Sequence, residues 1–181
     1  MSHRSRFVLE ALAEHNKHLT DVERTAKYNK MAQSAFRFYR GTNHLFWADF
    51  SGDERLQRFS SSQTRIWLQG DLHSENYGAY HNDSGDIIYS LNDFDDAVVA
   101  DYQFDLWRMA VSIVLVARQI SYQTLTNNEI EGLLDAFVES YLDSLSEYRG
   151  NRDEHQKVFH SNALTKHLDE FLEDISDRTN V

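Results

Sequence analysis

Two short polar segments are the main indication of the fold: residues 69–76 read QGDLHSEN, and residues 92–96 read NDFDD. The first holds an Asp that is followed five residues later by an Asn, and the second comes after two predicted strands. Enzymes that transfer phosphate in the manner of kinases need one carboxylate at the attacking hydroxyl and two oxygen ligands on magnesium. The order and spacing of these side chains therefore predict that a loop and a hairpin carry a phosphate-transfer site.

The composition limits the classes of partner that fit the chain. It has 181 residues, enough for one domain with a core, and 29 acidic against 18 basic residues give a formal net charge of −11. This excess of acid argues against nucleic acid or an anionic membrane as the main partner. The chain has no cysteine, which excludes disulfides and thiolate metal sites. Together with the lack of a signal-peptide pattern, this predicts a cytoplasmic protein.

The first 62 residues predict a mainly helical part with one short strand. A capping box of Thr20 and Glu23 opens the second helix. Alternating aromatic and basic side chains predict a strand over residues 35–40. The helices predicted in this part span residues 5–19, 20–33 and 42–50.

Strands are expected around the two polar segments, and helices after them. A β-prone run over residues 65–69 ends at the Gly-Asp pair, and Asn-Asp-Ser-Gly at residues 82–85 predicts the turn of a hairpin. The hairpin strands are expected over residues 77–81 and 86–91, and the later helices over residues 103–120, 127–146 and 161–175.

Each polar side chain of the two segments suits one part of phosphoryl transfer. Asp71 follows a strand and is interpreted as the base that orients and deprotonates the acceptor hydroxyl. Asn76 and Asp93 offer hard oxygen ligands for magnesium, and Asp95 could contact a second metal or nearby backbone. His73 is expected to brace the loop through hydrogen bonds. The alternative for each residue alone is a turn position that satisfies local backbone groups.

The candidates for binding phosphate and for supporting the site lie outside the two segments. Arg40 is the best candidate to bind phosphate oxygens, and Lys30 is the next. Arg40 could equally be a surface residue that pairs with one of the many carboxylates. Asp105 lies one turn into the helix predicted over residues 103–120, and Arg108 could pair with it on the helix surface in a structural role.

Four sequence blocks give the chain a resemblance to a known group. They are FYRG at residues 38–41, GDLHSENYG at 70–78, NDFD at 92–95 and DLWR at 105–108. The second and third resemble the signature of the aminoglycoside phosphotransferase and choline kinase superfamily. All four together resemble an uncharacterised bacterial family within that kinase-like group, and the resemblance covers residues 27–118 well.

The resemblance implies both a fold and roles for individual residues. It implies an α+β, protein-kinase-like fold, with Asp71 as catalytic base and Asn76 and Asp93 as magnesium ligands. Asp105 resembles the helix carboxylate that holds the backbone of the catalytic loop in such folds. The alternative for Asp105 is a carboxylate that complements the helix dipole. The bacterial family itself has no known activity to carry over.

The chain also departs from complete kinase-like domains. It has only seven glycines and no G-x-G-x-x-G, and helices take the place of the usual nucleotide-binding sheet. We expect a single domain with a reduced helical N-terminal part (1–62), a short antiparallel sheet with the site (63–100) and a helical C-terminal part (101–181). Complete relatives are longer, so we expect an incomplete domain: a fragment, a truncated gene product or a split protein.

The sequence leaves three functions open. The first is transfer of a phosphate from ATP to the hydroxyl of a small molecule, with Mg²⁺ as cofactor. The second is an inactive kinase-like module that binds a nucleotide or a partner, because fold resemblance does not establish catalysis. The third is a two-metal phosphoesterase, since Asp71 and His73 fit its opening motif. The further ligands of such a site, an Asn-His pair above all, do not follow downstream.

Overall fold

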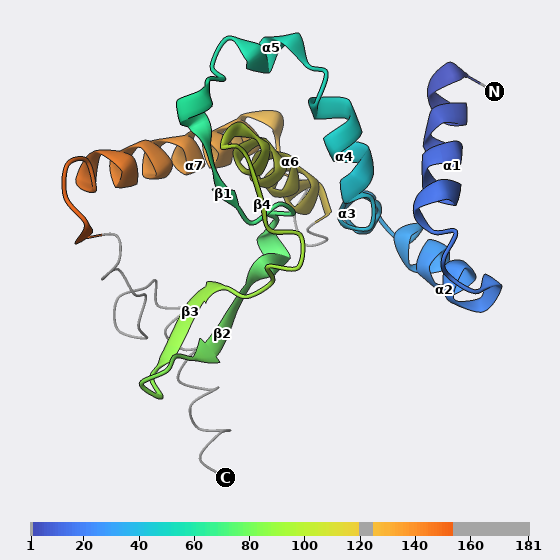
Figure 1. Ribbon diagram of the computed structural model, residues 1–181, viewed down its shortest axis with the longest axis horizontal. Helices are drawn as coiled ribbons and strands as arrows, with labels where there is room; N and C mark the ends of the chain where they lie inside the picture. The colour runs from blue at the N-terminus through green and yellow to red at the C-terminus, as the bar shows by residue number, and fades with distance from the viewer. Residues whose placement is uncertain (1, 120–124, 154–181) are drawn as a thin grey trace. The chain divides into compact units, whose positions relative to one another are not determined.

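A computed structural model describes residues 2–119 and 125–153 of the chain (Figure 1). These residues form helices and two small antiparallel sheets, so the expected α+β class is confirmed. The chain divides into two compact units. Of the described residues, the first unit comprises 2–73, 96–119 and 125–134, and the second comprises 74–95 and 135–153.

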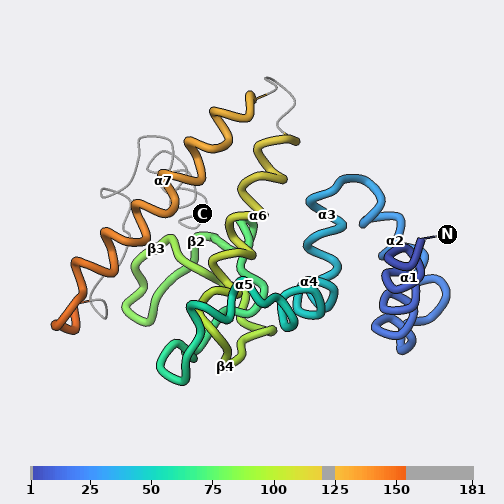
Figure 2. Tube along the Cα trace, turned by 90° about the horizontal axis from the view of Figure 1, so that it is seen from above, coloured from blue at the N-terminus to red at the C-terminus, as the bar shows by residue number. Residues whose placement is uncertain are grey.

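The first unit is mainly helical. Helices α3 and α4 both contact α6, as Figures 1 and 2 show, while α1 contacts α4 and α2 contacts α3. The bounds of its helices are α1 His3–His15, α2 Asp21–Met31, α3 Ala35–Arg40, α4 Asn43–Phe50, α5 Glu54–Gln57 and α6 Gln103–Gln119. The helices predicted over residues 5–19, 20–33, 42–50 and 103–120 are therefore present, and α5 is a short helix that was not predicted from the sequence.

Local side-chain chemistry explains where two of these helices begin. The predicted capping box of α2 is confirmed, since Glu23 N–H donates to the Thr20 hydroxyl and Thr20 N–H to the Glu23 carboxylate. The strand predicted over residues 35–40 is wrong, because these residues form α3. Ser34 caps α3 by accepting a hydrogen bond from Arg37 N–H at 3.1 Å.

Burial within α3 shows why the alternating pattern was misleading. Phe36 is 3% exposed, but Phe38 is 39% exposed, whereas a half-buried strand would place both on one face. In a helix, positions three residues apart share a face, so Phe36 and Tyr39 can both turn inward. Aromatic residues therefore fill the interior at helical spacing.

A two-stranded antiparallel sheet completes the first unit. The predicted strand β1 (Arg65–Leu68) pairs with β4 (Val98–Asp101), which the sequence did not predict. Gly70 follows β1 with φ +86°, and a Cβ at this position would collide with the carbonyl oxygen of Asp96. Glycine therefore allows the loop after β1 to pass close to the chain that enters β4.

The described part of the second unit centres on the predicted hairpin. Strand β2 (Tyr77–His81) pairs with β3 (Ile87–Leu91), and Asn82 Oδ1 accepts backbone hydrogen bonds across the turn at 3.0 and 2.9 Å. The hairpin is therefore confirmed. Helix α7 (Asn127–Glu147) matches the helix expected over residues 127–146 and belongs to both units. The helix predicted over residues 161–175 lies outside the described residues.

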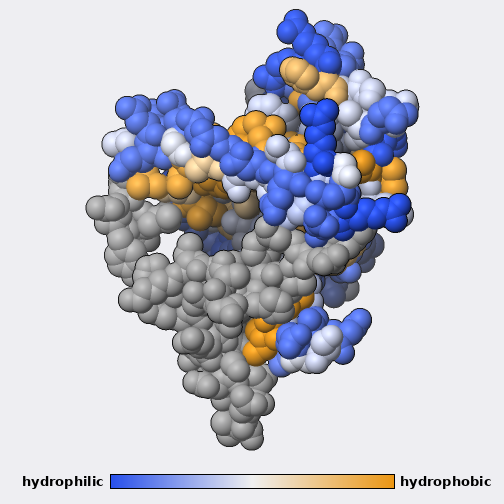
Figure 3. Space-filling view, turned by 90° about the vertical axis from the view of Figure 1, so that its left-hand side faces the viewer, coloured by the Kyte–Doolittle hydropathy of each residue, from blue (hydrophilic) through white to orange (hydrophobic). Residues whose placement is uncertain are grey.

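Many large apolar side chains remain at the surface of the described residues. Orange hydrophobic areas interrupt the hydrophilic surface in Figure 3. Trp67 on β1 is 76% exposed, and Val138 and Leu142 on α7 are also exposed. Among residues 2–119 and 125–153, none of the helices combines the length and the apolarity needed to cross a lipid bilayer.

Candidate active site

The loop that carries Asp71 is fixed at its backbone by an aspartate from α6. Asp105 accepts hydrogen bonds from the N–H groups of Gln69, at 2.7 Å, and Gly70, at 3.1 Å. Asp71 N–H in turn donates to the side-chain oxygen of Gln69 at 2.9 Å. The contact implied for Asp105 by the kinase resemblance, a carboxylate holding the backbone of this loop, is thus present.

Two side chains of α4 hold the same loop from its carbonyl side. Asn43 Nδ2 and Trp47 Nε1 both donate to the carbonyl oxygen of Gly70, at 3.0 and 3.2 Å. Asn43 Nδ2 also donates to Asp96 Oδ2 at 3.1 Å. Both backbone groups of Gly70 are therefore satisfied by side chains, which limits the positions that the neighbouring Asp71 can adopt.

Arg108 is the partner of Asp71, and the predicted surface pair of Arg108 with Asp105 is wrong. Arg108 is 1% exposed, and its Nε and Nη2 both contact Asp71 Oδ1, the former at 2.6 Å. The guanidinium carbon lies 4.0 Å from the centre of the Tyr39 ring, and Nη2 donates to the Tyr39 carbonyl oxygen at 3.1 Å. Arg108 is therefore buried against Asp71 and is not exposed on the surface of α6.

The surroundings of Asp71 favour its neutral form more than water does. Burial raises the pKa of Asp71 from 3.8 to about 6, because a buried charge loses hydration. The Arg108 guanidinium opposes this rise in pKa, and the charge of Asp96 adds to it. Both contacts from Arg108 end on Oδ1, while Oδ2 lies 3.7 Å from His73 Nε2, beyond hydrogen-bond length. Oδ2 is therefore the carboxylate oxygen on which neither of these Arg108 contacts ends.

The remaining loop residue singled out by the sequence, His73, is buried. Its ring is 1% exposed and packs edge-on against Phe36 of α3, with ring centres 6.0 Å apart. The end of the loop is therefore packed into the interior, while the predicted hydrogen bonds of His73 stay a prediction.

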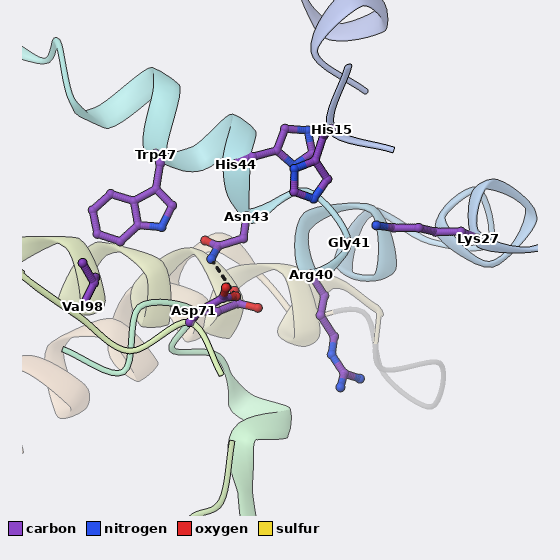
Figure 4. Close-up of a pocket in the computed structure, with 10 residues that line it drawn as sticks. His15, Lys27, Arg40, Gly41, Asn43, His44, Trp47, Asp71 and Val98 are labelled. Atoms are coloured by element: carbon purple, nitrogen blue, oxygen red, sulfur yellow. Dashed lines mark hydrogen bonds between the residues drawn. The ribbon is translucent and has the colours of Figure 1, made fainter. Parts of the chain in front are cut away.

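A pocket of about 470 Å³ in the first unit opens beside Asp71 (Figure 4). This volume lies in the usual range for small-molecule sites. Of the two predicted phosphate-binding cations, Arg40 lines the pocket, whereas Lys30 is exposed on α2 and does not. The lining residues are His15, Lys27, Arg40, Gly41, Asn43, His44, Trp47, Asp71, Asp96 and Val98.

The predicted metal ligands belong to the second unit and lie at one end of its hairpin. Tyr77 pairs with Leu91, and Asn92 N–H donates to the carbonyl oxygen of Asn76 at 3.0 Å. Asn76 immediately precedes β2, and Asp93 follows β3 by two residues. The register therefore brings the chain around Asn76 next to the chain around Asp93.

The side chains at this end of the hairpin differ in burial. Asn76 is 1% exposed, and neither its amide oxygen nor its amide nitrogen finds a hydrogen-bond partner among the described residues. Asp93 and Asp95 are exposed, and Asp95 N–H donates to Asp93 Oδ1 at 3.4 Å. A buried amide without partners is costly unless a ligand satisfies it.

This donor set suits magnesium better than softer metals. Magnesium takes oxygen ligands and is usually held by one or two carboxylates, with water and phosphate oxygens in the other positions. The amide oxygen of Asn76 and the carboxylate of Asp93 are oxygens of this kind. In residues 2–119 and 125–153, no three His, Asp or Glu side chains gather in an arrangement that could hold a metal.

The model of one protein family matches most of the chain. Its description is "Uncharacterized protein conserved in bacteria (DUF2252)", and it matches residues 21–181. The chain belongs to this family. No curated protein and no solved structure matches it.

Several lining residues of this DUF2252 protein were not assigned to the site from the sequence. Lys27, His15 and His44 come from α2, α1 and α4, so no local motif joins them. Asn43 and Trp47 of α4 were not assigned to the site either, and a large aromatic such as Trp47 more often belongs to a core. The one available signal for Lys27 was its position in a local run of basic residues.

Proposed function

We propose that this DUF2252 protein is a kinase-like, magnesium-dependent phosphotransferase that moves a phosphate from ATP to a hydroxyl of a small molecule. The observation that carries the proposal is the setting of Asp71. Its carboxylate lies in the wall of a pocket of ligand size, its loop is fixed by Asp105, and one of its oxygens is held by Arg108. A fixed carboxylate beside a pocket can orient a hydroxyl and accept its proton.

The charge state of Asp71 suits the role of a base. With a pKa raised to about 6, the carboxylate is mostly ionised at neutral pH and binds protons more strongly than an ordinary Asp. Because Arg108 fixes Oδ1, the acceptor hydroxyl would donate its hydrogen bond to Oδ2. The proton would move to Oδ2 as the acceptor oxygen attacks the terminal phosphorus, and the bond from that phosphorus to its bridging oxygen would break to release ADP.

The other roles follow from the resemblance and from the chemistry of each side chain. Asn76 and Asp93 would hold Mg²⁺ through their side-chain oxygens, and Asp95 would support them at the same end of the hairpin. When bound, the ion neutralises charge on the nucleotide phosphates. Arg40, whose guanidinium suits bidentate contact with phosphate oxygens, would neutralise further charge from the pocket wall.

An inactive nucleotide-binding module is the second candidate, and the ion pair of Asp71 favours it. A carboxylate that is already held by a guanidinium is a weaker base than a free one. The raised pKa of Asp71 points the other way, because burial outweighs the effect of Arg108. We therefore retain transfer to a hydroxyl as the main proposal. A measurement of turnover distinguishes the phosphotransferase from the inactive nucleotide-binding module.

Replacement of Asp71 by Asn separates binding from turnover. The amide keeps an oxygen for Arg108 but cannot accept the proton, so ADP formation with a panel of hydroxyl compounds should fall by about 10²-fold or more. Binding of MgATP, measured by calorimetry, should change little. An equal loss of binding and turnover would assign Asp71 a structural role, and unchanged turnover would exclude it as the base.

A further inference from the structure

The pocket beside Asp71 has a second group of polar side chains that the proposed chemistry does not use. Figure 4 shows His15, His44 and Lys27 gathered on one side of Asn43, with Asp71 on its other side. The side chains come from helices α1, α4 and α2. One pocket thus joins carboxylates to a cluster of nitrogen-bearing groups.

Lys27 supplies a positive charge that no acidic group pairs with among the described residues. Its ammonium donates to Asn16 Oδ1 at 2.7 Å, and Asn16 is fully buried and neutral. A hydrogen bond to an amide positions the ammonium but leaves its charge uncompensated. Lys27 is half-buried, so its charge is less screened than that of an exposed lysine.

The two histidines share this electrostatic environment. Their rings stack with centres 3.9 Å apart and planes inclined by 9°. The pKa of His44 is lowered to about 4, mainly by burial and in addition by the charges of His15 and Lys27. Burial also lowers the pKa of His15, with contributions from Lys27 and His18 that Asp96 partly offsets. The cluster therefore disfavours a positive charge on either ring beside Lys27.

Asn43 and His44, which both line the pocket, hold polar atoms without partners among the described residues. The side-chain oxygen of Asn43 and both ring nitrogens of His44 are buried and have no hydrogen-bond partner among the described residues. Buried polar groups in folded proteins are rarely left unpaired. Their concentration in one pocket wall points to a ligand that supplies the missing hydrogen bonds.

We propose that the pocket recognises an acceptor that carries an anionic group, a phosphate or a carboxylate, as well as its hydroxyl. The anion would lie against Lys27 and His15, and the hydroxyl would reach Asp71. This inference rests on the proposed function, because it names the class of molecule that receives the phosphate. An anion at Lys27 supplies the negative charge that the cluster lacks.

The charges at the other side of the pocket favour an acceptor over the nucleotide as the occupant. Asp71 and Asp96 both line this pocket. A whole polyphosphate that filled it would lie against these two carboxylates, which repel it, whereas in the proposed function only the terminal phosphate approaches Arg40 in the pocket wall. A molecule with an anion at one end and a neutral hydroxyl at the other meets a favourable partner at each end.

The test follows the histidine ring signals by NMR while inorganic phosphate is added to the full chain without magnesium or nucleotide. We expect the signals of His15 and His44 to shift in the wild type. Lys27→Met should weaken phosphate binding roughly tenfold, as expected when one charge-assisted hydrogen bond is lost. Lys17→Met is the matched control, because Lys17 is exposed and pairs with Glu14, and this variant should bind phosphate like the wild type.

A second measurement distinguishes an anion of the acceptor from a phosphate of the nucleotide. MgADP binding, measured by calorimetry, should be the same in Lys27→Met and in the wild type if the anion belongs to the acceptor. Loss of MgADP binding together with phosphate binding would overturn the assignment to the acceptor. Equal phosphate binding by Lys27→Met and the wild type, or histidine signals that do not move, would overturn the site itself.

The two proposals can fail separately in these measurements. Binding of inorganic phosphate requires neither magnesium nor turnover, so it can occur in a protein that transfers no phosphate. Conversely, the protein could transfer phosphate while its histidine signals stay unchanged on addition of phosphate. The proposed function would then stand, and the proposal of an anionic acceptor would be wrong. The folded state of Lys27→Met is checked by the amide spectrum of α2.

Discussion

The loop of Asp71 and the loop of Asp93 contrast in how the protein holds them. The first is fixed by side chains from two helices, since Asp105 accepts from its N–H groups and Trp47 donates to its carbonyl oxygen. In the second, Asp93 and Asp95 are exposed at the end of a hairpin. Nearby, Asn76 keeps a buried amide that has no partner among the described residues.

This difference has a simple chemical interpretation. A base must be in position before its substrate arrives, so its loop benefits from rigid support. Ligands of magnesium are brought together by the ion and the phosphates, so they need less support from the protein alone. On this account, the first loop depends on protein contacts for its structure, and the second depends on a bound ligand.

The largest expected effect is on stability, when Arg108 is removed. Arg108→Met leaves the carboxylate of Asp71 buried without its cation, which should lower the free energy of unfolding by about 3–5 kcal/mol. Chemical denaturation measures this loss. Arg118→Met is the control, because Arg118 is exposed on the same helix and should matter little.

A double variant sharpens the same test. If Asp71 and Arg108 act as a pair, the loss in Arg108→Met combined with Asp71→Leu should be smaller than the sum of the two single losses. Additive losses would show that each side chain is held by other contacts, and the account of a fixed base would weaken.

A smaller effect is expected when the support of the loop backbone is reduced. Asp105→Asn keeps one acceptor oxygen and loses the other, so one of the N–H groups of Gln69 and Gly70 is left unpaired. The free energy of unfolding should fall by about 1–3 kcal/mol. Hydrogen exchange should quicken at these two amides while the hairpin of β2 and β3 is unaffected. Uniformly faster exchange would instead indicate global destabilisation.

The ionisation of Asp71 gives a prediction for pH. Because the pKa of Asp71 is raised to about 6, its carboxylate is ionised above that pH and protonated below it. A base works only when ionised, so kcat/KM should fall about tenfold, or ~1.4 kcal/mol, for each pH unit below 6. The carbonyl-carbon NMR signal of the Asp71 side chain should titrate over the same range. Titration near pH 4 with a rate that is flat between pH 5 and 7 would contradict the role.

The smallest effect on stability is expected in the loop of Asp93. Asp93→Asn changes an exposed side chain, so the free energy of unfolding should stay within about 0.5 kcal/mol of the wild type. Asp83→Asn, at an exposed position of the hairpin turn, provides a matched control. A loss of several kcal/mol in Asp93→Asn alone would mean that this loop is as tightly integrated as that of Asp71.

Features with strong local signals could be predicted from the sequence. The turn at residues 82–85 and the capping box at Thr20 specified the hairpin and α2, because their chemistry acts within a few residues. The order of Asp71, Asn76 and Asp93 predicted that the two loops carry the site. The turn and the capping box depend on spacing within a few residues, and the order of the three site residues can be read along the chain.

Features that depend on tertiary packing could not be predicted in this way. The six residues of α3 read as a strand, because their aromatic and basic side chains alternate in sequence. Arg108 looked like a surface partner of Asp105, and only the packing of α6 shows that it is buried against Asp71. The cluster of Lys27, His15 and His44 joins three helices, so no spacing along the chain reveals it.

The most direct test of the proposed magnesium-dependent nucleotide site is calorimetry of ATP binding with and without magnesium, in the wild type and in two variants. We predict that the wild type binds ATP at least roughly tenfold more tightly with magnesium, since Asp93 would hold the ion and the ion would neutralise charge on the nucleotide phosphates. Asp93→Asn should lose this gain, and Asp71→Asn should keep it. Equal affinity with and without magnesium in the wild type, or a gain that survives in Asp93→Asn, would contradict the account.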